Sequence, residues 1–457
     1  MKGDFSSFTF DPRKQFRCVR QQQGRVELDA DWNEQAAIFL HYLERLAADL
    51  IGPFGGPVGD LGFAITTRTG NPPDLNIGAG RYYVGGVLAE NLAQDAHYLG
   101  QAFLQDSDKL PGVPFLAYLD VWERHVSYLE DDSIREVALD GPDTASRGQL
   151  VWQVRVTDKA PGQQFPTKPE EVDKIWPDWV KLFRPPASGS LVARAKPSGD
   201  PTSPCVASPD ARYRGLENQL YRVEIHTPGT AAAGATFKWS RDNGSVAFAI
   251  VDLATDSASK TTTVTLERLG QDDRQSLAQD DWVEIVDDHV VLGTGKGSLL
   301  QVATPPDVER AQVTLRGLPD TKAGQDKTLH PLLRRWDYGR ATGATGARPA
   351  ADGALPIVEG IPIVEGKDKW IDLEDGIEVS FQPALDKQPA QVYATGDYWL
   401  IPARTATGDI VWPGEPTAPE ALPPQGIVHR FAPLALLLAG GPVELRKSFK
   451  TLAVPVT

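Results

Sequence analysis

The sequence predicts a mainly β protein, built from several small antiparallel β-sandwich or barrel domains with one long N-terminal amphipathic helix. Its 42 Gly and 37 Pro residues together exceed the usual share, which favours many short strands joined by turns. Apolar residues alternate over short runs through most of the chain, and a helical apolar period is strongest near the N-terminus. A chain of 457 residues is too long for one core, so we expect two to four domains.

Bulk composition excludes several classes of function. A net charge of -15 argues against a nucleic-acid binder, which needs a basic face to displace counterions. The sequence has no run of about 18 apolar residues, so no membrane span is expected. Its first residues lack the apolar core of a secretory signal, which predicts a protein that starts in the cytoplasm. Cys18 and Cys205 are too few for a disulfide framework or a cysteine-based zinc site.

We expect the long helix over residues 31–51. Asp31 is placed to accept the free amides of the first turn, and Glu34, three residues later, completes a capping-box pattern. Gly52 and Pro53 then end the helix. Apolar residues recur at three- and four-residue steps and form one stripe: Ala36, Phe39, Leu43, Leu46, Ala47 and Leu50.

This stripe has two explanations. It covers a β domain of the same chain, or it forms a seam between copies of the chain, so that residues 31–51 mediate self-association. One face of about five helical turns does not distinguish the two arrangements. We favour the cover.

Composition and turn signals divide the chain into six segments. Within the third of them, residues 169–182 have a helical pattern. The segments are an N-terminal arm, short strand and helix (1–60), a β domain (61–158), a connecting segment (159–204), a β barrel or sandwich (205–340), a linker or long loop (341–366) and a C-terminal β segment (367–457).

The first half of the chain has few strong local signals besides the helix. Residues 1–20 hold aromatic side chains among polar ones, which indicates either an extended arm laid along a neighbouring surface or an edge strand. Residues 54–60 are expected to be a glycine-rich loop. Strand patterns follow over 74–91, 114–131 and 151–156.

The second half of the chain is richer in strand signals. Asn243 and Gly244 separate two alternating apolar runs, and both tolerate a positive φ, so we expect a two-residue hairpin turn. Four strand patterns follow between residues 261 and 318 with the spacing of a small barrel, and one of them spans residues 281–292. The last strand patterns cover residues 370–381, 395–404 and 431–441.

We predict no catalytic, cofactor-binding or metal-binding residue, and no cofactor. Helix capping explains Asp29 and Asp31. Residues 293–298 (GTGKGS) resemble a phosphate-binding loop but lack its spacing, so a glycine-rich turn explains them. Four pairs of neighbouring acids lack the glycine and terminal glutamate of a calcium loop, and solvated loop tips explain them. The pairs are Asp131/Asp132, Asp272/Asp273, Asp280/Asp281 and Asp287/Asp288.

Other chemistry-bearing residues give no signal for an enzyme. The seven histidines are dispersed without metal-binding spacing, and no serine lies in a G-x-S-x-G turn. Paired carboxylates of a glycosidase are not recognisable in a sequence, because their separation is spatial. The 11 tryptophans are expected as core and interface anchors, and a glycan-stacking platform is the alternative. That platform would use Trp32, Trp122, Trp239 and Trp399.

Ten long blocks spread over nearly the whole chain resemble a known family. They are KGDFSSFTFDP, QQGRVELDADWNEQ, IGAGRYYVGGVLAEN, YLDVWERHVSYLEDDSIREVALDGPDT, RGLENQLYRVEIH, FKWSRDNGSV, HPLLRRWD, LEDGIEVSF, TGDYWLIPAR and HRFAPLALL. These blocks resemble a bacterial family of uncharacterised proteins associated with phage-tail-like contractile injection systems, of the baseplate or tail-fibre type.

The resemblance implies a function in assembly. It implies a structural subunit of a phage-tail-like contractile injection particle, in its baseplate, fibre or tip region, and no enzyme. Its partners would be the other subunits of that particle, and its location would be the cytoplasm, within a particle that can be released from the cell. Such particles have threefold and sixfold symmetry, so the helix stripe would then suit a trimer seam. The alternatives are a carbohydrate-binding adhesin or tail-fibre module and, second, a glycan-cleaving enzyme.

Overall fold

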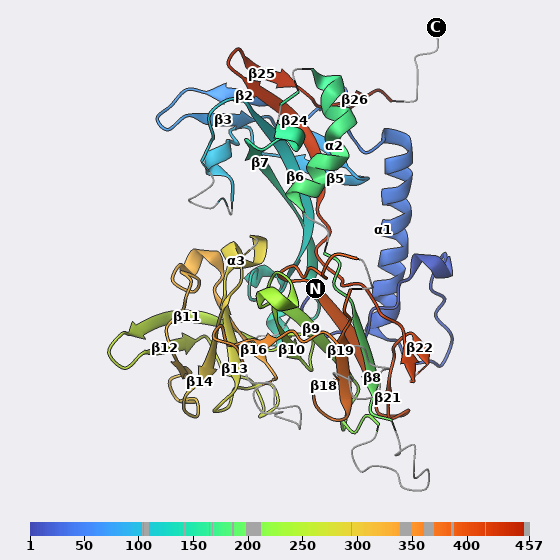
Figure 1. The fold of residues 1–457 in the computed structure, drawn as a ribbon, viewed down its shortest axis with the longest axis vertical. Coiled ribbons are helices and arrows are strands. Elements are labelled where there is room, and N and C mark those ends of the chain that lie inside the picture. The colour runs from blue at the N-terminus through green and yellow to red at the C-terminus, as the bar shows by residue number, and fades with distance from the viewer. Residues whose placement is uncertain are drawn as a thin grey trace.

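The computed structural model describes residues 1–102, 104, 109–139, 143–163, 165–166, 168–184, 187–197, 212–293, 295–338, 349–360, 370–384, 388–415 and 417–451. It confirms the predicted fold class, since the chain is mainly β, with a closed barrel, smaller sheets and one long N-terminal helix. The strands form an upper and a lower lobe, and helix α1 (Asp29–Ile51) runs along one side of both (Figure 1).

The upper lobe is made of β1–β7, α2 and β24–β26. Its sheets have the strand orders β26-β1-β4-β5, β25-β24-β6-β7 and β2-β3. The elements are β1 (Phe54–Pro57), β2 (Ile65–Arg68), β3 (Asp74–Ile77), β4 (Gly80–Val84), β5 (Val87–Asn91), β6 (Phe115–Val126), β7 (Arg147–Thr157), α2 (Pro169–Phe183), β24 (Arg430–Leu438), β25 (Gly441–Glu444) and β26 (Ser448–Phe449).

The lower lobe is made of β8–β23 and the short helix α3. Its sheets have the orders β17-β10-β9-β20-β21 and β18-β19-β8, and β11-β12-β15-β14-β13-β16 close into a barrel. The sheet strands are β8 (Leu191–Ala195), β9 (Gln219–Thr227), β10 (Thr236–Ser240), β17 (Leu355–Pro356), β18 (Ile371–Asp372), β19 (Ile377–Phe381), β20 (Tyr398–Arg404) and β21 (Asp409–Ile410), with the hairpin β22 (Gly414–Glu415) and β23 (Ala418–Pro419).

The barrel and the short helices complete the chain. The barrel contains β11 (Ala247–Asp256), β12 (Thr261–Leu266), β13 (Trp282–Val286), α3 (Asp288–Leu292), β14 (Ser298–Val302), β15 (Gln312–Arg316) and β16 (Leu332–Trp336). The 3-10 turns are η1 (Pro12–Lys14), η2 (Tyr98–Gly100), η3 (Asp132–Ile134), η4 (Val137–Leu139), η5 (Pro161–Gln163), η6 (Ala231–Ala233) and η7 (Lys327–Leu329).

Strand pairing joins segments that are far apart in the chain. β24, near the C-terminus, pairs with β6 of the upper lobe, and β20 pairs with β9 of the lower lobe. β19 pairs with β8, which lies within the predicted connecting segment. Three hydrophobic clusters result, one in the upper lobe, one within the sheets of the lower lobe and one in the barrel.

The hairpin predicted at Asn243 and Gly244 is wrong, although the turn itself is present. Both residues have a positive φ, of 51° and 66°. The flanking strands β10 and β11 do not pair, because the turn carries the chain from the sheet into the barrel. The Asn243 side chain hydrogen-bonds Arg222 and the carbonyl of Gly3, so it holds two other segments at the crossing.

Two further sequence expectations need correction. Residues 54–60 are not all loop, because residues 54–57 form β1 between β26 and β4, where glycine is required. A Cβ on Gly56 would lie 2.6 Å from the Leu61 side chain and 2.7 Å from the Arg81 carbonyl oxygen. Residues 281–292 are not one strand either, because Asp287 accepts a hydrogen bond from the Val290 amide and starts α3.

Two buried carboxyl groups of the lower lobe are expected to contribute less stability as the pH rises from about 4 to about 8. Burial raises the pKa of Glu374 from 4.5 to about 7, and it raises the pKa of Asp397 from 3.8 to about 6. The folded protein therefore keeps these protons to a higher pH than the unfolded chain does. The stability that they contribute is complete below the unfolded pKa values and is lost as the pH rises through the folded ones.

Relative to Glu374→Gln, we expect the free energy of unfolding of the parent protein to fall by about 1–3 kcal/mol over this range. Urea unfolding at a series of pH values measures it. Groups with a lowered pKa, such as His226, change stability in the opposite direction, but they titrate alike in both proteins. The difference between Glu374→Gln and the parent protein should therefore grow with pH, whereas Glu415→Gln, at an exposed carboxyl of β22, should follow the parent protein. An identical slope in Glu374→Gln and the parent protein would contradict the assignment.

Candidate functional site

Helix α1 begins two residues earlier than predicted, and its capping differs from the prediction. The residue that precedes it is Leu28, which makes no side-chain cap, so the capping box of Asp31 and Glu34 is wrong. The acids near the helix start hold the N-terminal arm instead. The Ser6 amide donates to Asp29 (2.9 Å), and the Thr9 hydroxyl donates to Glu34 (2.6 Å). The predicted end is confirmed, with the Gly52 amide bonded to the Ala48 carbonyl.

Residues 1–20 form an arm rather than an edge strand, since residues 1–28 contain no strand. The arm lies beside the lower half of α1 (Figure 1), where the Val19 amide donates to Gln35 at 2.8 Å. Its beginning is anchored in the lower lobe. The Lys2 ammonium lies 2.9 Å from the buried Glu224 carboxylate, and Arg404 donates to the Ser6 carbonyl at 3.0 Å. The arm therefore ties α1 to the lower lobe.

The inner face of α1 attaches the helix to the upper lobe. Ala30 and Ile38 are the buried residues of the helix. Glu44 makes the closest approach, because its carboxylate pairs with Arg430 at 2.7 Å and its carbonyl oxygen lies over Gly86.

Gly86→Ala is expected to push α1 off the upper lobe. A Cβ on residue 86 would lie 2.0 Å from the Glu44 carbonyl oxygen, at a φ of +85°. Gly59→Ala is a matched control, since Gly59 has a φ of +98° and no atom within 4 Å of such a Cβ. Gly86→Ala should lower the free energy of unfolding by about 1–3 kcal/mol more than the control does. Equal losses in urea unfolding would rule out the close contact.

The outer face of α1 carries the apolar stripe and, apart from the half-buried Ala47, leaves it in solvent, so the favoured interpretation as a cover is wrong. The exposed fraction is 63% for Trp32, 57% for Phe39 and 57% for Leu43. Leu46 and Leu50 continue the stripe and are also exposed. Leu40 and Tyr42 flank its centre and are more than half exposed. We call these seven side chains the outer face.

The outer face has the size of a protein interface. A fully exposed large side chain has roughly 200 Å² of accessible surface. Scaled by their exposed fractions, the seven side chains together have about 800 Å² of accessible apolar surface, as much as one partner of a standard interface. That area exceeds the largest apolar patch of most monomers, and such patches mark protein contacts or ligand grooves. A helix that turns its larger apolar side chains to water is the feature of this chain that most needs a partner.

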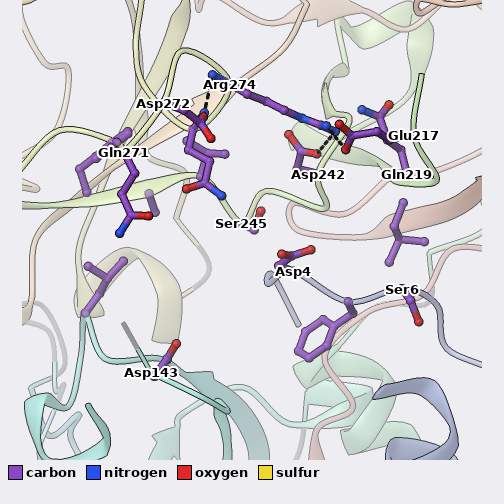
Figure 2. A pocket seen from close by; sticks show the side chains of 18 of the residues that line it. Asp4, Ser6, Asp143, Glu217, Gln219, Asp242, Ser245, Gln271, Asp272 and Arg274 are labelled. Atoms are coloured by element: carbon purple, nitrogen blue, oxygen red, sulfur yellow. Dashed lines mark hydrogen bonds and ion pairs between the residues drawn. The ribbon is translucent and has the colours of Figure 1, made fainter. Parts of the chain in front are cut away.

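A cleft of about 1040 Å³ lies between the arm and the lower lobe. Figure 2 shows Arg274 reaching from the loop at Asp272 to Glu217 and Asp242, with Asp4 and Ser6 of the arm on another wall. Glu217 forms an ion pair with Arg274. Asp242 lies 3.7 Å from Arg274 and 3.4 Å from Arg335, and burial raises its pKa.

The carboxylates of the cleft serve the local structure. Asp272 accepts the amides of Arg274 and Gln275, and Asp143 accepts the Tyr128 amide. Arg274 pairs with both central carboxylates and so holds the 272–275 loop against the start of β9. Among the residues that the structure describes, no group of three or more His, Cys, Asp or Glu is arranged to hold a metal.

The paired acids are less exposed than expected. Asp131 and Asp272 do accept loop amides, as surface turns do. Asp281, Asp287 and Asp288 are buried, so solvated loop tips are the wrong explanation for them. Their oxygens are satisfied within the protein. Asp281 accepts the Ala278 amide, Asp287 starts α3, and Asp288 pairs with Arg124 at 3.0 Å and His330 at 2.6 Å.

The glycine-rich segment 293–298 is structural in its described part. Residue 294 lies outside the described residues. Lys296 donates to Thr227 (2.9 Å) and pairs with Asp352 (3.3 Å), and Ser298 begins β14. Cys18 is a free, half-buried thiol, and Cys205 lies outside the described residues.

The four tryptophans of the glycan alternative do not share a surface. Trp122, Trp239 and Trp399 are buried at 2%, 1% and 2% exposure, and Trp32 alone is exposed, on α1. They therefore do not form the stacking platform. Among the described residues, no helix is long and apolar enough to cross a membrane.

Comparison with known proteins gives one match. The chain matches a family model described as a family of unknown function (DUF6519), over residues 1–168 and 183–441. No curated protein and no solved structure matches it.

Proposed function

Starting from the finding that the chain belongs to DUF6519, a family of unknown function, we propose that it is a structural subunit of a phage-tail-like contractile injection particle. It acts by assembly with other subunits in the baseplate, fibre or tip region and has no catalytic activity. It is made in the cytoplasm and leaves the cell only within the particle.

The outer face of α1 carries this proposal. A contiguous apolar face on a helix held at both ends, by the arm below and by Arg430 above, is a preformed contact surface. Preformed surfaces bind with little loss of conformational entropy. The link to a contractile particle comes from the ten sequence blocks that resemble proteins of such systems.

The two alternative functions have less support. A glycan-binding adhesin would need exposed aromatic side chains in a groove, and three of the four candidate tryptophans are buried. A glycan-cleaving enzyme would need two carboxylates free to act on a substrate. In the cleft of Figure 2, Glu217 and Asp242 both pair with Arg274 and are therefore engaged within the protein.

The proposal is tested by co-sedimentation with particles. A tagged chain is produced in a host that makes tail-like particles, and sheathed particles are collected by ultracentrifugation and identified by electron microscopy. The parent chain should sediment with them. Leu43→Asp, in the outer face, should reduce its recovery about tenfold or more, because a charge would be buried in the contact.

Leu216→Asp is the matched control. Leu216 is 97% exposed and is not part of the outer face, so its substitution should leave recovery unchanged. A parent chain that stays in the supernatant while particles form would overturn the proposed function.

A further inference from the structure

We propose that the partner of the outer face is the same face of a second copy of this chain, in an antiparallel helix pair about a twofold axis. This inference rests on the proposed function, because it names one partner of an assembly subunit. It begins with the spacing of the exposed residues. Trp32, Ala36, Phe39, Leu43, Leu46 and Leu50 are separated by four, three, four, three and four residues, which is the heptad spacing of coiled coils.

This spacing continues through the full length of the stripe. Ala36, Leu43 and Leu50 occupy one heptad position (a), and Trp32, Phe39 and Leu46 occupy the other (d). The stripe is about 27 Å long at 1.5 Å per residue. A seam of this spacing packs best against another helix, since a and d side chains insert between four residues of the facing helix.

Side-chain size selects the antiparallel arrangement. Around a twofold axis near His41, each a residue faces a d residue of the second copy, so Trp32 faces Leu50, Ala36 faces Leu46, and Phe39 faces Leu43. Every layer then combines two different side chains, and the small Ala36 lies opposite a large one.

A parallel pair would stack identical residues instead. Ala36 would meet Ala36 and leave a gap between a Trp32 layer and a Phe39 layer that are both crowded. Gaps and crowding each destabilise a packed interface.

The residues that flank the seam also find suitable partners in this antiparallel arrangement. In an antiparallel pair, Leu40 faces Leu40 and Tyr42 faces Tyr42 of the second copy, one on each side of the axis. These are the two flanking members of the outer face, so all seven of its side chains gain a partner. Asp49 lies opposite Gln35, and no two like charges face each other across the seam.

The area agrees with a stable dimer. At about 800 Å² from each copy, the pair would bury about 1,600 Å², which is the standard size of a specific interface. The contact is isologous, as in the twofold dimers that are the commonest protein oligomers.

The mass of the purified full chain tests the pairing. Light scattering at micromolar and at tenfold lower concentration should give the mass of a dimer. Leu43→Asp enters the interface twice and should raise the dissociation constant about 100-fold or more, whereas Leu216→Asp should have no effect. Leu43 is exposed in the monomer, so the far-UV circular dichroism and melting temperature of the variant should stay close to those of the parent chain.

Disulfide trapping tests the direction of the helices, in a background with Cys18→Ser and Cys205→Ser. A mixture of the Trp32→Cys and Leu50→Cys proteins should form a mixed disulfide dimer under mild oxidation. Leu50→Cys alone should not, because its two copies would lie about 27 Å apart.

Three results would overturn the inference: self-crosslinking of Leu50→Cys, a trimeric mass, or a monomer at both concentrations. A monomer that still sediments with particles would refute the pairing and leave the proposed function in place. A dimer that does not sediment with them would refute the proposed function alone.

Discussion

Glu284→Ala is expected to lower the free energy of unfolding by about 3–5 kcal/mol, because it leaves a buried ammonium group without its closest partner. Glu284 lies on the barrel strand β13 and accepts hydrogen bonds from Lys238 of β10 (2.6 Å) and from the Trp336 indole (2.9 Å). Its side chain and that of Lys238 are only 3% and 4% exposed. Burial alone would raise the pKa of Glu284, but the adjacent Lys238 ammonium lowers it, so the carboxylate is charged.

Glu284→Gln removes the charge of the side chain but keeps its shape, so it measures the contribution of the charge alone. The amide still accepts from the Trp336 indole but carries no charge for Lys238, so we expect an intermediate loss of about 2 kcal/mol. Glu415→Ala, at an exposed carboxyl of β22, should change stability by less than about 0.5 kcal/mol. Urea unfolding followed by tryptophan fluorescence measures all three. If Glu284→Ala lowers the free energy of unfolding by less than about 1 kcal/mol, the expectation is wrong. Glu224, which lies 3.4 Å from the Lys238 ammonium, would then be enough to stabilise that charge.

Trp179→Ala is expected to lower the free energy of unfolding by about 3–5 kcal/mol, because it opens a cavity under α2. Trp179 is fully buried in the upper core and contacts the rings of Phe165, Trp176 and Phe183, at centroid distances of 5.9, 6.2 and 6.3 Å. Phe183 in turn stacks on Tyr118 of β6 at 3.9 Å. The aromatic cluster is therefore the contact through which α2 covers the upper sheet.

Trp179→Phe should cost much less, below about 1.5 kcal/mol. The indole nitrogen of Trp179 is buried and has no hydrogen-bond partner in the described part of the chain, so phenylalanine removes an unsatisfied donor while it keeps most of the ring. Leu182→Ala, on the exposed side of the same helix, is the control, with an effect within about 0.5 kcal/mol. Similar losses for the phenylalanine and alanine variants, measured by thermal unfolding, would contradict this account of the site.

Local patterns in the sequence predicted local structure well. The α1 stop at Gly52 and the helix over 169–182 are present, and each of the four strand patterns between residues 261 and 318 contains a barrel strand. Turns, caps and apolar periods depend on near neighbours, which a sequence shows directly. The turn at Asn243 and Gly244 also has the expected backbone, yet its flanking strands pair elsewhere. Strand partners are chosen by the global fold, which a two-residue signal does not contain.

The candidate site was only partly predictable. Periodicity identified the apolar stripe of α1, but a periodic pattern does not reveal whether its apolar face points into the fold or into solvent. The capping box failed because Asp29 and Glu34 hold an arm that begins more than 20 residues earlier. The aspartates that pair with His97, His330 and His429 were not recognisable either, since these partners lie 23, 42 and 309 residues away.

The order of β25-β24-β6-β7 has a consequence for synthesis on the ribosome. β6, with eight consecutive buried residues at its start, leaves the ribosome early, but its neighbour β24 comes from residues 430–438. Until β24 has been synthesised, the edge of β6 that pairs with it has no partner. Unpaired edges of apolar strands recruit other chains. The lower lobe is encoded between these strands and emerges before β24, so the upper lobe closes only after the lower lobe has left the ribosome. Truncated chains that lack β24 should therefore aggregate through the open edge of β6.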